Sequence, residues 1–354
     1  MAIPTEAIGS IPRPPAVLDA WEEFEAGRIG RDRLDAVLDG AVRETIRELE
    51  ATGSPVVTDG EQSKPSFVTY PLQGLTNLET GGITIPFVDG HTRQLPRLTG
   101  GPFRYGVHAE RYTEAARRHA SVPVKQAVIS ASALSLLYPE RTLDAYPKEA
   151  FLADLLNEVE ADIRGALRAG AHSVQVDFTE ARLSCKLDPS GTLLRYWVAL
   201  NNMVLDRFSG AERSRLGVHT CPGGDQDATH SADVPYARIL PQLLSLNVGR
   251  FYVQLASEPD PASVLALIAR HVSPDRQVFV GVVDPVDPRV ETAEEVRDRV
   301  LEAAERLGAG SLGTTDDCGF APFGDDTSTA REVAFAKIQA RVEGTRLASR
   351  ALGL

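Results

Sequence analysis

The stretch Leu216-Gly217-Val218-His219-Thr220-Cys221-Pro222-Gly223-Gly224-Asp225 joins a short apolar run to two side chains that bind metals. The apolar run predicts a buried strand. Residues two apart on an extended chain point to the same side, so we expect His219 and Cys221 to share a face. Gly223 and Gly224 then let the chain turn away. The same unit, an apolar run that ends in polar residues, recurs along the chain.

Eight such runs, each followed by a segment of helical periodicity, are spread over the 354 residues. Besides the run that leads to His219, they lie at 2–8, 55–62, 122–129, 173–177, 250–255, 277–283 and 311–314. The predicted helices are 16–51 in two pieces, 147–169, 192–208, 235–245, 261–271, 293–307 and 330–348. Short, continuously apolar strands are typical of a parallel sheet that is buried on both faces. The pattern predicts an α/β fold, a single (β/α)8 TIM barrel, with residues 1–354 as one domain.

Residues 83–99 interrupt this pattern. Residues 83–88 alternate between apolar and polar, and Asp89-Gly90 is a hairpin signal. We expect an inserted β-hairpin here that serves as a lid or an oligomer contact, so a homo-oligomer stays open.

Composition limits the classes of partner. The net charge is −12, with 43% apolar and 24% charged residues, which disfavours nucleic acid and anionic membranes as partners. We found no membrane-spanning stretch and no basic-then-apolar leader, so a cytoplasmic protein is expected. There are three cysteines, and a disulfide between Cys221 and Cys318 is improbable in a reducing compartment.

Cys318 follows the apolar run 311–314 and lies in an Asp/Gly-rich loop, as Cys221 does. An imidazole with two thiolates suits Zn²⁺, and an open fourth position would make the site catalytic. The competing interpretation is that both cysteines are small buried hydrophobic residues. Their position in loops just past apolar runs favours the ligand role.

Chemistry in TIM barrels takes place at the C-terminal ends of the strands. Ser10, Glu61, Asp177, Gln254 and Asp284 all fall at or just past a predicted strand end. For the carboxylates among them, a helix cap or a loop turn is an equally good interpretation.

Six short motifs, in order, resemble the C-terminal catalytic barrel of the cobalamin-independent methionine synthase family, within the methionine-synthase-like and uroporphyrinogen-decarboxylase-like superfamily. The motifs are Ile8-Gly9-Ser10-Ile11-Pro12, Asp59-Gly60-Glu61, Val174-Gln175-Val176-Asp177, His219-Thr220-Cys221, Gly281-Val282-Val283-Asp284 and Asp317-Cys318-Gly319. The resemblance covers essentially the whole chain.

The resemblance implies zinc bound by His219, Cys221 and Cys318. It also implies a thiol amino acid whose amino group meets Ser10, Glu61 and Asp177. The implied activity is transfer of a methyl group to a thiol, most simply to homocysteine to give methionine, from a methyl-folate or a non-folate carrier. Alternatives are alkylation of another thiol, as in epoxide:coenzyme M transferases, and a metal-binding or regulatory barrel without catalysis.

The chain departs from the family in three places. Gln254 stands where the family's fourth zinc ligand is a Glu, with Glu258 the nearest acid and water a further candidate. Residues 178–182 replace a Glu-Pro-Ala type segment beside the amino-acid pocket. The family's additional N-terminal barrel, which helps to hold a folate polyglutamate tail, is expected to be missing.

Further residues near these motifs are candidates for supporting roles. His230 is a candidate general acid for the leaving group, or a loop cap. Asp284 is a candidate to orient His219 through its second ring nitrogen. Cys185 has no assigned role. Three basic residues either bind a small anionic group or pair with neighbouring carboxylates: Lys64, Arg182 and Lys186.

Overall fold

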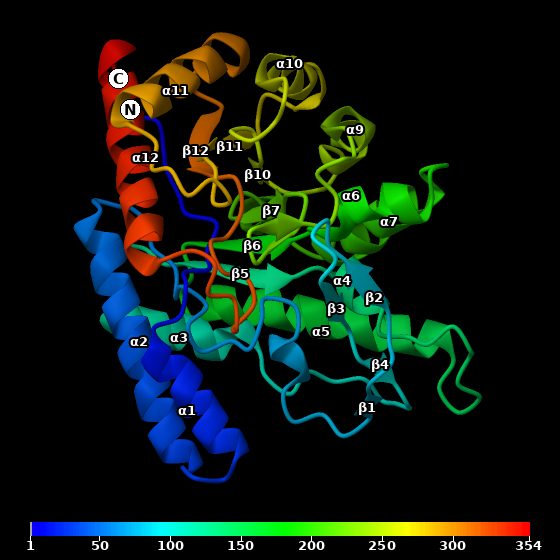
Figure 1. The fold of residues 1–354 in the computed structure, drawn as a ribbon. Helices are drawn as coiled ribbons and strands as arrows, with labels where there is room; N and C mark the ends of the chain where they lie inside the picture. The colour runs from blue at the N-terminus through cyan, green and yellow to red at the C-terminus, as the bar shows by residue number, and fades with distance from the viewer. Residues whose placement is uncertain (1) are drawn as a thin grey trace.

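A central parallel sheet organises the chain, whose computed structural model describes residues 2–354. Its six strands are in the spatial order β12-β11-β10-β7-β6-β5 (Figure 1). The strands are β5 (Lys125–Ile129), β6 (Ser173–Asp177), β7 (Leu216–Thr220), β10 (Arg250–Val253), β11 (Gln277–Val283) and β12 (Leu312–Asp316). Almost every residue in these strands is buried, as their apolar sequences predicted.

The first two predicted strands flank the two edges of this sheet. Thr5 forms a single parallel bridge to β12, and Val57 forms one to β5. The two flanking segments also meet each other, because the Ile11 amide donates to the Gly60 carbonyl at 3.0 Å. Six of the eight predicted strands form the sheet and the first two form single bridges at its edges, and the predicted α/β fold is confirmed.

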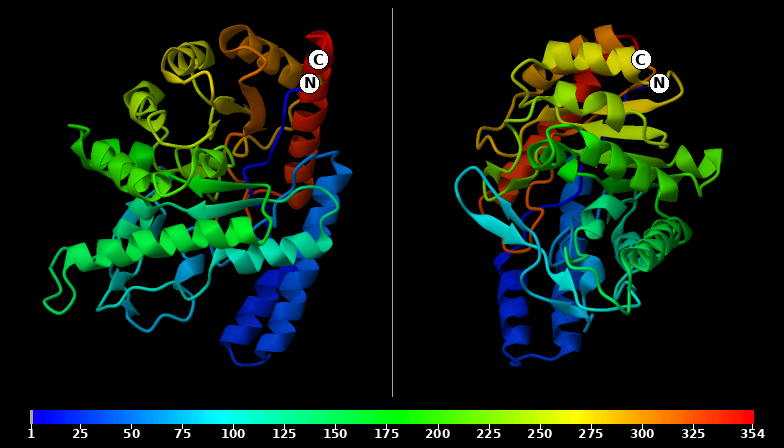
Figure 2. Two further views of the ribbon diagram at one scale, coloured as in Figure 1. Left: turned by 180° about the vertical axis from the view of Figure 1, so that it is seen from behind. Right: turned by 90° about the vertical axis from the view of Figure 1, so that its right-hand side faces the viewer.

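Helices surround the sheet (Figure 2). They are α1 (Pro15–Glu25), α2 (Arg31–Ala51), α3 (Ala109–His119), α4 (Ala131–Ser135), α5 (Lys148–Arg168), α6 (Glu180–Leu187), α7 (Thr192–Leu205), α8 (Gly210–Arg213), α9 (Leu240–Leu243), α10 (Pro261–His271), α11 (Ala293–Leu307) and α12 (Arg331–Ala351), with 3₁₀ turns η1 (Tyr70–Leu72) and η2 (Tyr236–Arg238). Among residues 2–354, no helix combines the length and apolar content that crossing a bilayer requires.

Most predicted helices are present within a few residues of their expected bounds, and α10 coincides with its prediction. The expected helix at 235–245 is wrong, because this segment forms only η2 and the single turn of α9. Pro241, which lacks an amide hydrogen, is placed in the first turn of α9, where a helix tolerates it. The helices α3, α4, α6 and α8 were not predicted.

Helices α1 and α2 form a hairpin that extends away from the barrel (Figure 1). They share a small apolar core that includes Val17, Leu34 and Leu38. Gly27 turns the chain between them with a φ of +69°. The predicted break of residues 16–51 into two helical pieces is thus confirmed.

The insertion at 83–99 is a β-hairpin, as predicted. Strands β2 (Thr84–Pro86) and β3 (Thr92–Gln94) pair antiparallel, and β1 (Leu78–Glu79) pairs with β4 (Arg97–Leu98) beside them. The Val88 amide donates to the Thr229 carbonyl at 3.1 Å. Thr229 belongs to β9 (Ala228–Thr229), which pairs with β8 (Gly224–Asp225) in the loop after β7. The hairpin therefore touches the loop that follows His219 and Cys221.

Candidate functional site

A cavity of about 680 Å³ opens at the C-terminal ends of the strands. It is lined by the hairpin, by α1 and by the loops after the strands. Six of the nine site residues predicted from the sequence line it: Ser10, Glu61, Asp177, His219, His230 and Cys318. Cys221 is fully buried behind this wall, and Gln254 and Asp284 are also outside the lining.

The three predicted metal ligands meet. His219 on β7, Cys221 just after it and Cys318 just after β12 place their ligand atoms within 4.8 Å of one another. The two sulfurs are 2.8 Å apart, and neither ring nitrogen of His219 has a hydrogen-bond partner within the described part of the chain. The neighbouring Cys221 sulfur, together with burial, raises the pKa of the Cys318 thiol. A buried imidazole without partners beside two thiols fits a soft divalent cation such as Zn²⁺.

Gln254 is the predicted fourth metal ligand. This residue follows β10, which lies beside β7 in parallel register, so Gln254 is level with Cys221. Its Nε2 donates to Ser257 at 2.7 Å, whereas its buried Oε1 has no partner in the residues that the structure describes. Glu258, the alternative ligand, is engaged in an ion pair with the buried Arg182. The amide oxygen of Gln254 is therefore the freer of the two candidates.

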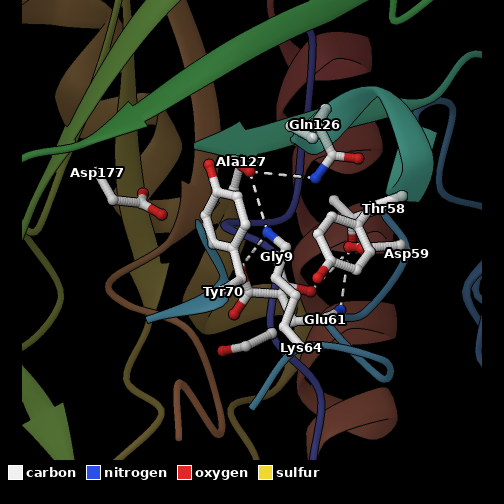
Figure 3. A network of polar contacts seen from close by, with 12 residues as sticks. Gly9, Thr58, Asp59, Glu61, Lys64, Tyr70, Gln126, Ala127 and Asp177 are labelled. Atoms are coloured by element: carbon white, nitrogen blue, oxygen red, sulfur yellow. Dashed lines mark hydrogen bonds and ion pairs between the residues drawn. The ribbon is translucent and has the colours of Figure 1, made fainter. Parts of the chain in front are cut away.

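Two buried carboxylates stand on the cavity wall. Glu61 pairs with Lys64, whose Nζ is 3.0 Å from Glu61 Oε1 and 3.0 Å from the Ala127 carbonyl (Figure 3). Asp177 accepts a hydrogen bond from Gln175 at 2.7 Å. Burial raises the pKa of both carboxyl groups. Since a desolvated carboxylate is costly without a counter-charge, this wall suits a ligand that brings a cation.

Ser10 reaches the same cavity from the first strand segment. Its Oγ accepts from the Ala321 amide at 3.3 Å, next to the Cys318 loop. Gly319 is in such close contact with this hydroxyl that a Cβ there would lie 2.1 Å from it. The serine and the cysteine loop are thus fixed against each other.

His230 lies in the cavity wall, but its electrostatics oppose the predicted general-acid role. Its Nδ1 lies 2.6 Å from the Ser231 hydroxyl. Burial, with smaller contributions from Lys186 and Arg182, lowers the pKa of His230 to about 4. The ring is therefore neutral near pH 7, with no acidic proton to give.

Asp284 does not make the predicted contact with His219. Its carboxylate accepts from the Val286 amide at 3.0 Å, a turn within its own loop. Both ring nitrogens of His219 are without partners among residues 2–354. Asp284 thus caps a local turn instead of orienting His219 as predicted.

The basic residues near the site are paired. Lys64, Arg182 and Lys186 form ion pairs with carboxylates, as the second of the two sequence interpretations proposed. Cys185 lies in the main apolar core and does not belong to the group of candidate metal ligands.

Sequence reasoning missed two cavity residues. Arg93, on β3, binds Asp225 and Asp325 and so ties the hairpin to two loops. Glu180 is buried at the start of α6. The only signal for Glu180 was the departure of residues 178–182 from the family pattern.

Comparisons with known proteins agree on one family. The family described as "Cobalamin-independent synthase, Catalytic domain" matches residues 3–341. A "Methionine synthase" of Saccharolobus islandicus (strain L.S.2.15 / Lassen #1) is 21% identical over 347 residues, covering 98% of this chain and 94% of the relative. A "5-methyltetrahydropteroyltriglutamate--homocysteine methyltransferase" of Syntrophotalea carbinolica is 23% identical over 323 residues, which span 90% of this chain and 40% of that protein.

Solved structures show the same fold. A B12-independent methionine synthase from Shewanella sp. W3-18-1, in complex with selenomethionine, superposes with a TM-score of 0.79 at 18% identity and covers 99% of each chain. A putative vitamin-B12 independent methionine synthase from Listeria monocytogenes has a TM-score of 0.70 at 20% identity, covering 98% of each chain.

Proposed function

Because this chain belongs to the cobalamin-independent synthase family through its catalytic domain, and is thus a methionine-synthase-like methyltransferase, we propose that it moves a methyl group to the thiol of homocysteine with the help of zinc. The observation that carries the proposal is the group of His219, Cys221 and Cys318 beside a cavity with two buried carboxylates. The methyl donor is a methyl-folate or another methyl carrier.

His219, Cys221 and Cys318 would hold the metal, with the Gln254 amide oxygen as the candidate fourth ligand. A bound zinc ion supplies Lewis acidity, which lowers the pKa of a substrate thiol so that it reacts as a thiolate at neutral pH. Two thiolate ligands need reducing surroundings, so we expect the protein to act in the cytoplasm.

Glu61, Asp177 and Ser10 would bind the amino group of the thiol amino acid. An ammonium group between the two carboxylates offsets their desolvation and donates charge-assisted hydrogen bonds. Binding at this wall fixes the amino acid, so that its thiol lies toward His219 and Cys318. Because the thiol and the methyl carrier are then held in one complex, the methyl transfer no longer depends on a chance encounter between them.

The electrostatics of the cavity bear on the donor. Its lining cations Lys64 and Arg93 are each engaged by acidic residues, and Arg13 is engaged by backbone carbonyls. Trp21 and Phe67 add aromatic surface. This lining favours a methyl carrier with a flat, weakly charged group over one with a polyanionic tail.

The proposal is tested by metal content and product formation. We expect wild-type protein purified without chelator to contain one zinc per chain and to form methionine from homocysteine with at least one donor of a methyl-folate and non-folate panel. The Cys221→Ser and Cys318→Ser variants should lose both. Cys185→Ser, which alters a buried core cysteine, is the matched control and should retain zinc. Wild-type protein without zinc, or with zinc and no methylation by any donor, would refute the proposal.

A further inference from the structure

Glu180 is a buried carboxyl group in the cavity wall with only one of its oxygens engaged. The residue is 4% exposed. Its Oε1 accepts hydrogen bonds from the hydroxyls of Ser130, at 2.7 Å, and Ser132. Its Oε2 is buried and has no partner among residues 2–354, and no ion pair to Glu180 is formed. Buried carboxyl oxygens without partners are uncommon and point to a ligand.

The surroundings of Glu180 are fixed. Ser130 directly follows β5 and caps α4, and Ser132 exchanges hydrogen bonds with Asn201 of α7 (2.7 and 3.2 Å). Because the serine hydroxyls are held in place, they fix the carboxyl group as well. Glu180 is therefore a rigid group, presented from the first turn of α6.

The charges around Glu180 favour its protonated form. Asp177, at the end of β6, is the acidic neighbour, and Arg182 on the same helix is already paired with Glu258. Across the cavity, Lys64 is paired with Glu61. Burial raises the pKa of Glu180 to about 7; the serine hydrogen bonds oppose this shift and the Asp177 charge adds to it. A group of this kind changes protonation in the range where a general acid works best.

We propose that Glu180 is the general acid that protonates the methyl carrier as the methyl group leaves it. The inference rests on the proposed methyl transfer. The thiolate sulfur forms a bond to the methyl carbon while the carbon–nitrogen bond of the carrier breaks. The electron pair of that bond stays on nitrogen, which takes the Glu180 proton. The proton lost by the thiol then restores Glu180, so a thiol and a methylated amine become a thioether and an amine.

The other acids in the cavity are less suited to this role. His230 is neutral near pH 7, as its lowered pKa shows. Glu61 is paired with Lys64, and Asp177 accepts from Gln175. Among the carboxyl groups of Glu61, Asp177 and Glu180, only Glu180 has an oxygen that is buried and without a partner among residues 2–354.

The test compares Glu180→Gln with wild-type protein, using homocysteine and 5-methyltetrahydropteroylglutamate. For the wild type, kcat should fall as pH rises through about 7, because the acid must be protonated. In Glu180→Gln, kcat should drop at least about 100-fold and lose this pH limb, while zinc content and the KM for homocysteine change little. A variant that keeps its kcat, or that only raises the KM for homocysteine, would overturn the inference; the second result would make Glu180 an ammonium-binding residue.

Ser132→Ala provides a graded control. Removing a hydroxyl that donates to the carboxylate disfavours the charged form, so the pH limb should move to higher pH without disappearing. Infrared spectroscopy of the protonated carboxyl band gives a readout that is independent of turnover. The band should titrate near pH 7 in the wild type and be missing in Glu180→Gln. Absence of methylation in the wild type would contradict the proposed function, whereas absence of the titrating band would contradict the role of Glu180.

Discussion

Buried polar atoms without partners mark the site at the level of single residues. Folded proteins satisfy the great majority of buried polar atoms. Among residues 2–354, the two ring nitrogens of His219, which lie close to two sulfurs, and the amide oxygen of Gln254 are buried without partners. The sequence shows the residue types, but it does not show that these atoms lack hydrogen-bond partners.

The pH dependence of stability tests the burial of His230. The pKa of His230 falls from an ordinary 6.5 to about 4 in the folded state. Between pH 6.5 and 4, His230 is therefore protonated in the unfolded chain but neutral in the folded protein. Stability contributed by this group is present above pH 6.5 and is lost as pH falls toward 4, by about 3 kcal/mol at most.

We expect His230→Asn to flatten the change in unfolding free energy between pH 6.5 and 4, measured by urea denaturation. His271→Asn, which alters an exposed histidine, serves as the control and should keep the wild-type slope. An unchanged slope in His230→Asn would mean that the ring is protonated in the folded protein.

At the level of elements, Arg93 holds the inserted hairpin over the cavity. Its Nη2 lies 3.0 Å from Asp225 Oδ1 and its Nη1 lies 2.9 Å from Asp325 Oδ2, and the Asp225 side chain is fully buried. Removing the cation leaves a buried carboxylate that regains hydration only if the hairpin opens. In Arg93→Ala, we expect hydrogen exchange in residues 84–94 to accelerate at least about tenfold, which corresponds to about 1.4 kcal/mol.

The control lies in the same insertion. Arg97 pairs with Glu79 at the surface, and both side chains are about half exposed. Arg97→Ala should leave hydrogen exchange in the hairpin nearly unchanged, since exposed pairs contribute little. Equal effects of the two substitutions would show that the Arg93 contacts do not close the hairpin.

Local patterns predicted the hairpin and most strands, because apolar runs and the Asp89-Gly90 turn act within a few residues. The contacts of Arg93 could not be predicted from local patterns, since its partners lie 132 and 232 residues away in sequence. The single-bridge pairing of the first two strands was also missed. Pro4 and Pro55 lack the amide hydrogens that a longer ladder needs.

At the level of the whole molecule, Arg341 joins the two ends of the barrel. From α12 it forms an ion pair with Asp316 of β12 at 2.9 Å and donates to the Glu6 carbonyl at 2.8 Å. Both charged side chains are almost fully buried. Arg341→Ala leaves the carboxylate of Asp316 buried without its cation, so we expect a loss of about 3–5 kcal/mol in the free energy of unfolding.

Arg346→Ala on the same helix is the matched control. Arg346 pairs with Glu343 at the surface, where such pairs are worth roughly 0–1 kcal/mol. Denaturant unfolding of both variants measures the difference. If Arg341→Ala costs no more than Arg346→Ala, the buried pair does not hold the ends of the barrel together.

Zinc X-ray absorption on untreated wild-type protein, with and without homocysteine, tests the central claim most directly. The account predicts one zinc per chain, bound by one imidazole, two sulfurs and one lighter oxygen or nitrogen ligand, with a third sulfur joining when homocysteine is added. Protein without zinc, or a sulfur count that stays at two with homocysteine bound, would contradict it.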